Sequence, residues 1–80
     1  MDYSATLWQC RRGLKELDVL LEPYCIRHYQ QLSDAQKQLF HELLSHEDID
    51  LYDWFFTDLA APTEALAALI KTIKEEPPFY

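Results

Sequence analysis

A single glycine, Gly13, stands in this chain of 80 residues, together with four prolines. Tight turns between strands draw heavily on glycine and proline, so a sequence this poor in glycine favours helices joined by short connections. Hydrophobic residues make up 49% of the chain, which is enough for one compact core, and the length corresponds to one domain. We therefore expect residues 1–80 to form a single all-α domain, a small bundle of about five short helices.

The first two helices are predicted from apolar periodicity and capping residues. One is expected over residues 3–11 with Ser4 as the candidate N-cap, and a second begins at Leu14. Pro23 lies within the second apolar pattern. Proline lacks the N–H of a helical hydrogen bond, and the sequence leaves open whether Pro23 kinks this helix or separates two helices.

Three further helices are predicted downstream. Ser33 and Gln36 have the spacing of a capping box, which starts a third helix that should stop near His46. A fourth covers residues 48–56, capped by Asp48 or Asp50, and a fifth starts at Pro62 and ends at Pro77-Pro78. The fourth is too apolar for one narrow face, so it is either buried on two sides or partly exposed. The apolar side chains expected to pack inside are Leu7, Trp8, Leu14, Leu17, Leu21, Tyr24, Tyr29, Leu39, Phe40, Leu43, Leu44, Leu66, Leu69, Ile70 and Ile73.

The formal net charge of −7 excludes some classes of partner. Nucleic acids and anionic membrane surfaces both require a basic face, so we expect neither. From Glu42 to Asp58 there are six carboxylates and no Lys or Arg. Such a run is more often a solvated face than a binding site, and the alternative is a charged docking surface that includes Trp54.

Targeting and redox features point to the cytoplasm of a bacterium. No stretch approaches the ~18 apolar residues of a transmembrane helix, and the first residues do not resemble a secretory leader. We therefore expect no stable insertion into a membrane. Cys10 and Cys25 form no CxxC pair, and we expect them to be reduced thiols.

Candidate chemistry is sparse. His41 and His46 are five residues apart, whereas HExxH requires a separation of four to place both histidines on one helix face. Cys25 and His28 lack an oriented base and an oxyanion site around them, and one glycine cannot build a phosphate-binding loop. We expect a protein that is not an enzyme, with no catalytic, metal-binding or cofactor-binding residues.

The lone glycine lies in the run Arg11-Arg12-Gly13-Leu14-Lys15-Glu16-Leu17-Asp18, which holds three of the seven basic residues. On a helix, Arg12 and Glu16 would share a face and form an exposed ion pair worth ~0.3–0.5 kcal/mol. Gly13 would then end the first helix in a left-handed conformation. From spacing alone, this structural interpretation is favoured over a binding function.

The segment Arg12-Gly13-Leu14-Lys15-Glu16 has the form Arg-Gly-x-x-Glu and resembles the succinate dehydrogenase assembly factors that promote covalent flavinylation. The Ser33-Asp34 helix start, residues 40–44, residues 50–54 and the Pro62 helix follow the same family pattern, so the resemblance covers nearly the whole chain. It implies a five-helix bundle that binds the flavoprotein subunit of succinate dehydrogenase, and it allows the related fumarate reductase as a second client. It also implies that the protein binds no cofactor itself and assists attachment of FAD, held by the client, to a client histidine.

The resemblance further implies that Arg12, Gly13 and Glu16 contact the partner, with Arg11 and Asp18 in the usual surroundings of the motif. Arg12 is expected to pair with a client carboxylate or carbonyl, and Glu16 to orient Arg12 or accept a client hydrogen bond. Gly13 is expected to let the client approach the backbone. We expect the free protein to be a monomer.

Two other functions stay open at this point. One is an antitoxin-like regulatory module paired with a small membrane protein. The other is a generic helical adaptor that uses the acidic region from Glu42 to Asp58, and it predicts that charge changes there matter more than Gly13.

Overall fold

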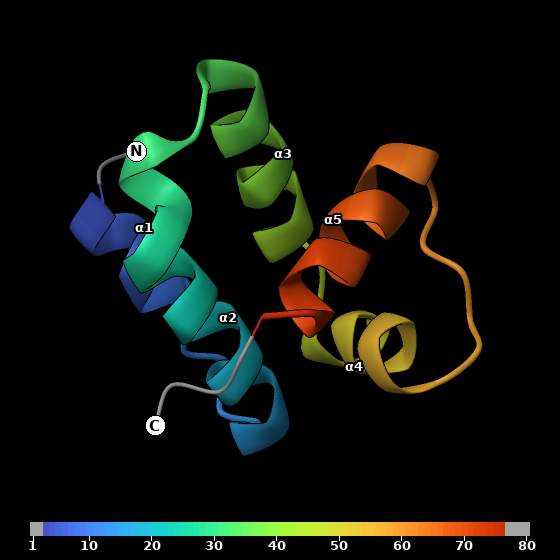
Figure 1. Cartoon of the computed structure of the whole chain (residues 1–80). Coiled ribbons are helices and arrows are strands. Elements are labelled where there is room, and N and C mark those ends of the chain that lie inside the picture. Colours follow the sequence, from blue (N-terminus) through green and yellow to red (C-terminus); the bar gives the residue numbers. More distant parts are fainter. Residues whose placement is uncertain (1–2, 77–80) are drawn as a thin grey trace.

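The computed structural model describes residues 3–76. Within this range the chain forms five α-helices and no strand (Figure 1), which confirms the all-α prediction. A single 3-10 turn, η1, follows the second helix directly. The bounds are α1 Tyr3–Gln9, α2 Lys15–His28, η1 Tyr29–Gln31, α3 Asp34–Leu44, α4 Asp48–Phe56 and α5 Glu64–Lys74.

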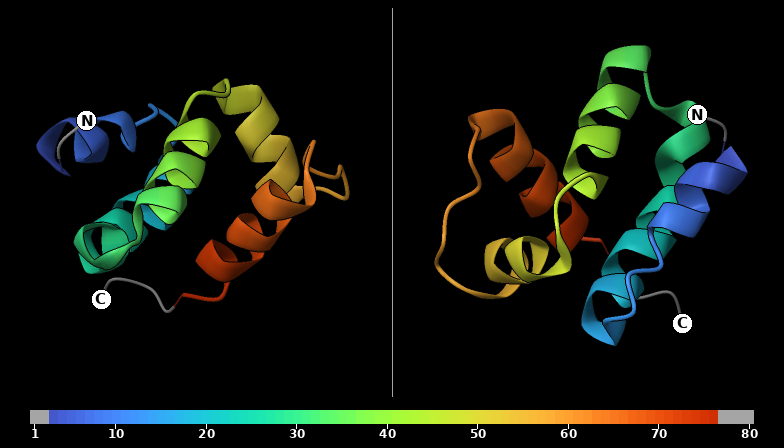
Figure 2. Two further views of the ribbon diagram at one scale, coloured as in Figure 1. Left: turned by 90° about the horizontal axis from the view of Figure 1, so that it is seen from above. Right: turned by 180° about the vertical axis from the view of Figure 1, so that it is seen from behind.

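Helix α5 is central to the packing, because it contacts α2, α3 and α4. Helix α1 lies along α2 on the outer side of the bundle, as the two views in Figure 2 show. Helix α4 crosses the lower end of the bundle in Figure 1, next to the start of α2. This arrangement brings the α1–α2 connection close to the α3–α4 connection.

Apolar side chains from these elements share one core. Thr6 is the buried residue of α1, and Trp8 is 71% exposed, so the prediction that Trp8 packs inside is wrong. A seven-residue helix on the outside of the bundle has room for only one inward face, and Trp8 lies on the other. Among the predicted core residues, those fully inside are Leu17, Leu21, Tyr24, Tyr29, Phe40, Leu43, Leu44, Leu66, Ile70 and Ile73, and those packed at its edge are Leu7, Leu14, Leu39 and Leu69.

The first two helices differ from the prediction at their ends. Helix α1 begins at Tyr3, so Ser4 lies inside it and is not the N-cap, and it ends at Gln9. Helix α2 begins at Lys15 and continues through the buried Pro23. The proline therefore does not divide the segment into two helices, although its missing N–H removes one intrahelical hydrogen bond.

The capping box of α3 is confirmed. The Gln36 N–H donates to Ser33 Oγ at 3.2 Å, and the Ser33 N–H donates to Gln36 Oε1 at 2.9 Å. Helix α3 ends at Leu44, two residues before the predicted position. Helix α5 begins at Glu64, two residues after the predicted start at Pro62, because Thr63 caps it and accepts the Leu66 N–H at 3.1 Å. The predicted stop at Pro77-Pro78 lies outside the described residues.

Helix α4 has the predicted span but not the predicted cap. Its N-cap is Glu47, which makes no side-chain capping hydrogen bond, and the Asp48 carboxylate is engaged elsewhere. Leu51 and Phe55 are buried, whereas Tyr52 and Phe56 are exposed. Of the two arrangements left open by the sequence, partial exposure is the one adopted.

Candidate partner-binding site

The Arg-Gly-x-x-Glu segment forms the connection between α1 and the first turn of α2. Gly13 has φ +85°, which confirms the left-handed conformation predicted for it. The prediction that Gly13 ends the first helix is wrong, because α1 already ends at Gln9. The Leu14 carbonyl then accepts the N–H groups of Leu17 and Asp18, both at 3.0 Å, and opens α2. Arg12 and Gly13 therefore lie in the loop, whereas Glu16 and Asp18 lie in the first helical turn.

The Arg12 side chain points into the protein and is only 15% exposed. Its Nε donates to Asp48 Oδ1 at 2.8 Å, and its terminal nitrogens donate to the carbonyls of Leu44 at 2.9 Å, His46 at 2.6 Å and Gln9 at 3.1 Å. The last carbonyls of a helix have no intrahelical partner, and a cation is favourable there. One guanidinium thus joins the end of α1, the end of α3 and the start of α4.

Asp18 fixes the backbone of Arg12. Its Oδ1 accepts the Arg12 N–H at 2.7 Å. A carboxylate in the first turn of α2 also interacts favourably with the helix dipole. Asp18 at the backbone and Asp48 at the side chain therefore hold Arg12 in place, and we call these three residues the Arg12 clamp.

The expectation that Arg12 and Glu16 share a helix face is wrong. Arg12 precedes α2, and within residues 3–76 its ion-pair partner is Asp48. Glu16 is exposed. The physical reason is that the loop directs the guanidinium toward four acceptors in a partly buried setting, which an exposed carboxylate on α2 cannot match.

Gly13 is exposed, and nothing lies within 4 Å of the position that a Cβ would occupy. The requirement for glycine inside this chain therefore comes from the positive φ and not from a close neighbour. The space over the Gly13 backbone is open, so a partner could come close to it. Contact with a partner at this position stays a prediction.

The other exposed residues of the segment surround Gly13 in sequence. Arg11 pairs with Glu22 at 3.1 Å and stands over the Trp8 ring, 5.9 Å from its centroid. Lys15 and Glu16 both face solvent. The partner-binding role predicted for Arg11, Arg12, Gly13, Glu16 and Asp18 is therefore divided by the geometry: Arg12 and Asp18 are used inside the chain, and Arg11, Gly13 and Glu16 are accessible.

Sequence reasoning missed Asp48 as the partner of Arg12 and interpreted it as a helix cap. The available clue was the charge pattern, because a basic cluster at residues 11–15 precedes an acidic run without basic residues. That pattern predicts attraction between the two regions but does not select one carboxylate among six. No side-chain pattern in the sequence indicates that backbone carbonyls also bind Arg12.

The cysteines and histidines have structural partners. Cys10 and Cys25 are free and buried, and the hydrogen bond between the two thiols, together with burial, raises the pKa of Cys10. The protonated, buried thiol of Cys10 is a poor nucleophile. The same hydrogen bond lowers the pKa of the buried Cys25 thiol. His28 lies against Glu76 and not against Cys25. His41 Nε2 is 2.6 Å from the Tyr29 hydroxyl, and burial, with a contribution from Lys37, lowers the pKa of His41.

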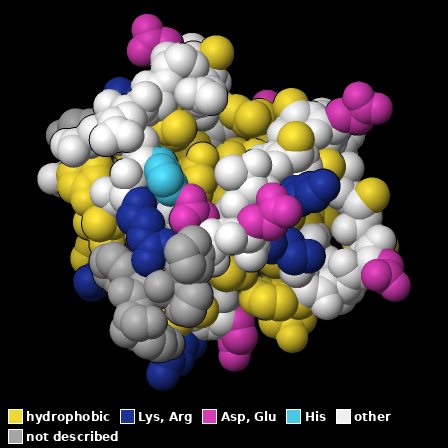
Figure 3. All heavy atoms as spheres, in the orientation of Figure 1, with side chains coloured by type: hydrophobic (Ala, Val, Ile, Leu, Met, Phe, Trp, Pro, Cys, Tyr) yellow, Lys and Arg dark blue, Asp and Glu magenta, His cyan; other side chains and the backbone are white. Residues whose placement is uncertain are grey.

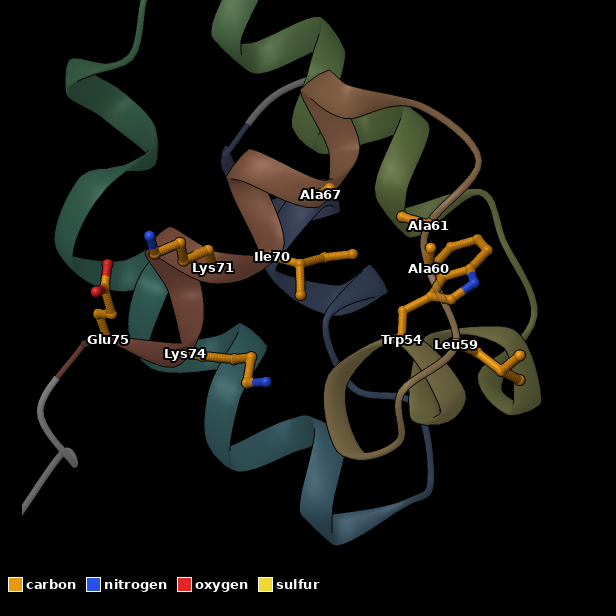
Figure 4. Close-up of a pocket in the computed structure, with 9 residues that line it drawn as sticks. All are labelled: Trp54, Leu59, Ala60, Ala61, Ala67, Ile70, Lys71, Lys74 and Glu75. Carbon is orange, nitrogen blue, oxygen red and sulfur yellow. The ribbon is translucent and has the colours of Figure 1, made fainter.

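A separate groove of about 310 Å³ lies between α4, the α4–α5 connection and α5 (Figure 4). Trp54, Leu59 and Ile70 form much of its apolar wall, and Lys71 and Lys74 stand at one end. No residue of the Arg-Gly-x-x-Glu segment lines it. An active site would require several polar groups aimed at one point, and this mostly apolar groove does not have that arrangement.

The described residues lack two further features. Residues 3–76 contain no cluster of three His, Cys, Asp or Glu side chains placed to hold a metal ion. None of the helices in this range combines the length and the apolar character needed to cross a bilayer.

Comparison with known proteins identifies the family. Residues 5–77 match the protein family described as flavinator of succinate dehydrogenase. A FAD assembly factor SdhE of Haemophilus ducreyi is 42% identical over 84% of this chain and 82% of its own length. Proteins of the same name from Shewanella oneidensis and Idiomarina loihiensis are 40% and 44% identical, over 92% and 80% of this chain and 90% and 71% of their own lengths. The chain therefore belongs to the family of succinate dehydrogenase flavinators.

Proposed function

We propose that this protein is a FAD assembly factor that binds the flavoprotein subunit of succinate dehydrogenase and promotes covalent attachment of FAD to it. The observation that carries the proposal is family membership over residues 5–77, with Arg12, Gly13 and Glu16 at the positions of the Arg-Gly-x-x-Glu motif. The curated relatives share the name FAD assembly factor. The flavoprotein of fumarate reductase is a second client under the same proposal.

The geometry supports two different roles within the motif, one in positioning the loop and one in contacting the client. The Arg12 clamp holds the loop, so Arg12 acts as a positioning residue and not as the client contact expected from the sequence. The accessible residues then meet the client. The open backbone at Gly13 admits close approach, and the Glu16 carboxylate can accept hydrogen bonds from the client.

The protein acts on the conformation of its client and binds no cofactor of its own. The chemistry of bond formation belongs to FAD and the acceptor histidine, and a bound factor stabilises the client geometry in which the two are aligned. Alignment alone can lower the activation free energy of bond formation by several kcal/mol, and the best-oriented intramolecular reactions reach ~7–11 kcal/mol. The protein is then a chaperone-like factor and not an enzyme, and it works as a monomer in the bacterial cytoplasm.

Co-expression tests the proposal. The chain is produced with a succinate dehydrogenase flavoprotein in a bacterial host that lacks its own factor, and covalent flavin is measured by fluorescence in a denaturing gel. A flavoprotein variant without the acceptor histidine shows how much signal is non-covalent. We expect the chain to raise covalent flavin, and Gly13→Arg and Glu16→Ala to reduce it while the helical circular dichroism stays native. Equal flavin with and without the chain would contradict the proposal.

A further inference from the structure

The outer face of α4 carries an exposed apolar stripe. Ile49, Tyr52 and Phe56 are 67%, 40% and 45% exposed. At about 100° per residue they lie on one side of the helix, turned away from the buried Leu51 and Phe55. The rings of Tyr52 and Phe56 are in contact, with centroids 5.0 Å apart. Figure 3 shows apolar side chains reaching the surface over α4. Single exposed apolar residues are ordinary, whereas a contiguous stripe marks an interaction surface.

Uncompensated negative charge borders this stripe. Glu47, Asp50, Asp53 and Asp58 belong to α4 and its flanks, and within residues 3–76 none of the ion pairs involves them. Asp48 differs because Arg12 neutralises it. A surface that is apolar at its centre and acidic at its edge is complementary to an apolar patch bordered by Lys or Arg.

One end of the stripe lies beside the loop that carries the motif. Asp48, which binds Arg12, directly precedes Ile49 and lies four residues before Tyr52, so it borders the stripe on the helix surface. Arg12 in turn precedes the open backbone of Gly13. The Arg12 clamp therefore holds the loop that carries Gly13 beside the start of α4, so a partner seated on this loop lies near the Ile49 end of the stripe.

We infer that the outer face of α4, defined by Ile49, Tyr52 and Phe56, is a second contact surface for the flavoprotein client, and that the client presents an apolar patch bordered by basic side chains. The inference rests on the proposed function, because it places the same client on both regions. Two contacts on one rigid body fix the orientation of the client, which a single loop contact does not.

Binding of the purified flavoprotein subunit, carrying non-covalent FAD, to variants of the chain tests the apolar part. Tyr52→Gln and Phe56→Gln should each raise Kd about tenfold or more, as truncation of central aromatic contacts does. Ile26→Gln is the matched control, since Ile26 is also 40% exposed but lies near the end of α2. It should leave Kd within about twofold, as expected for a residue outside the interface.

A second pair of variants tests the charge. Asp50 and Asp34 are both exposed acids in the first turn of a helix, so a change to Lys alters net charge and helix-dipole energy alike at both sites. Helix α3 begins at the opposite end of the molecule from α4 (Figure 1). Asp50→Lys should raise Kd several-fold and reduce its dependence on NaCl, because screening acts on exposed charge pairs. Asp34→Lys should do neither.

The outcomes separate the two proposals. Weaker binding of the α4 variants, with the Ile26 and Asp34 controls unchanged and native circular dichroism throughout, supports the second surface. If the unaltered chain binds the flavoprotein and the α4 variants bind equally well, the inference about α4 is overturned and the proposed function stands. If the unaltered chain does not bind the flavoprotein, the proposed function fails and the α4 surface fails with it.

Discussion

Two parts of one short segment differ in what they touch. Arg12 and Asp18 face the protein, where Arg12 makes four side-chain hydrogen bonds and Asp18 accepts its backbone N–H. Gly13 and Glu16 face solvent, and Glu16 takes part in no ion pair within residues 3–76. A motif that looks like a single binding unit in the sequence therefore consists of a clamp and a surface. Substitution of Arg12 should therefore lower stability, and substitution of Glu16 should lower only client binding. Gly13 combines the two, because its backbone has a positive φ although its surface is open.

Arg12→Ala should have the largest effect on stability. It removes the Asp48 ion pair and leaves the carbonyls of Leu44 and His46 without their donor in a partly buried site. We expect the free energy of unfolding to fall by about 2–3 kcal/mol, below the full range for a buried pair because Asp48 is partly exposed. Urea denaturation followed by circular dichroism measures this.

Arg11→Ala is the control for that substitution, because Arg11 is the neighbouring arginine and its pair with Glu22 is exposed. An exposed pair contributes about 0–1 kcal/mol, so the loss should be clearly smaller. Similar losses in the two variants would mean that the clamp does not contribute to the fold as described.

Gly13→Ala should have the second-largest effect. A Cβ at this position meets no neighbour, so the cost is that of the left-handed backbone, about 1–2 kcal/mol. Gly13→Asn should cost less, because asparagine tolerates this conformation better. Differential scanning calorimetry of the two variants checks the order. If alanine were as stable as glycine, the positive φ of this turn would be contradicted.

Acidification should cause a smaller loss of stability, which involves neither the Arg12 clamp nor the exposed residues Gly13 and Glu16. The pKa of His41 is lowered from its ordinary value of 6.5 by burial, so between the folded pKa and 6.5 the unfolded chain takes up a proton that the folded chain does not. The unfolded state then binds more protons, and stability is lost as pH falls through about 6.5 toward the lower folded pKa. Stability curves from about pH 7.5 to 5.5 should be flatter in His41→Gln than in the unaltered chain.

Glu16→Gln is the internal comparison for this pH experiment. The free energy of unfolding of Glu16→Gln should change with pH in parallel with that of the unaltered chain, since Glu16 is exposed and this substitution leaves His41 in place. Parallel curves for His41→Gln and the unaltered chain would contradict the burial of His41 as the cause.

Much of the fold follows from local rules in the sequence. The Ser33–Gln36 capping box, the apolar spacing along α3 and α5, and the left-handed Gly13 each depend on neighbouring residues, and each is confirmed. The predictions of a buried Trp8 and of an aspartate cap on α4 were wrong for a different reason. How far a helix lies from the core, and whether a carboxylate turns to a distant arginine, depends on tertiary packing.

The family could be predicted from the motif, whereas the direction of the Arg12 side chain could not. The family resemblance selected Arg12, Gly13 and Glu16, and the family is confirmed by the comparisons. The inward direction of Arg12 was not predictable, because its partners are a carboxylate 36 residues away and three backbone carbonyls. Carbonyl groups belong to every residue, so no side-chain pattern indicates which ones an arginine will bind.

The smallest expected effect on stability gives the sharpest test of the division between clamp and surface. Glu16→Gln keeps helix propensity and shape, and its free energy of unfolding should stay within about 0.5 kcal/mol of the unaltered chain. Covalent flavin formed on the co-expressed flavoprotein should nevertheless fall well below the level obtained with the unaltered chain. Full flavinylation by Glu16→Gln, measured at equal amounts of folded protein, would contradict the account.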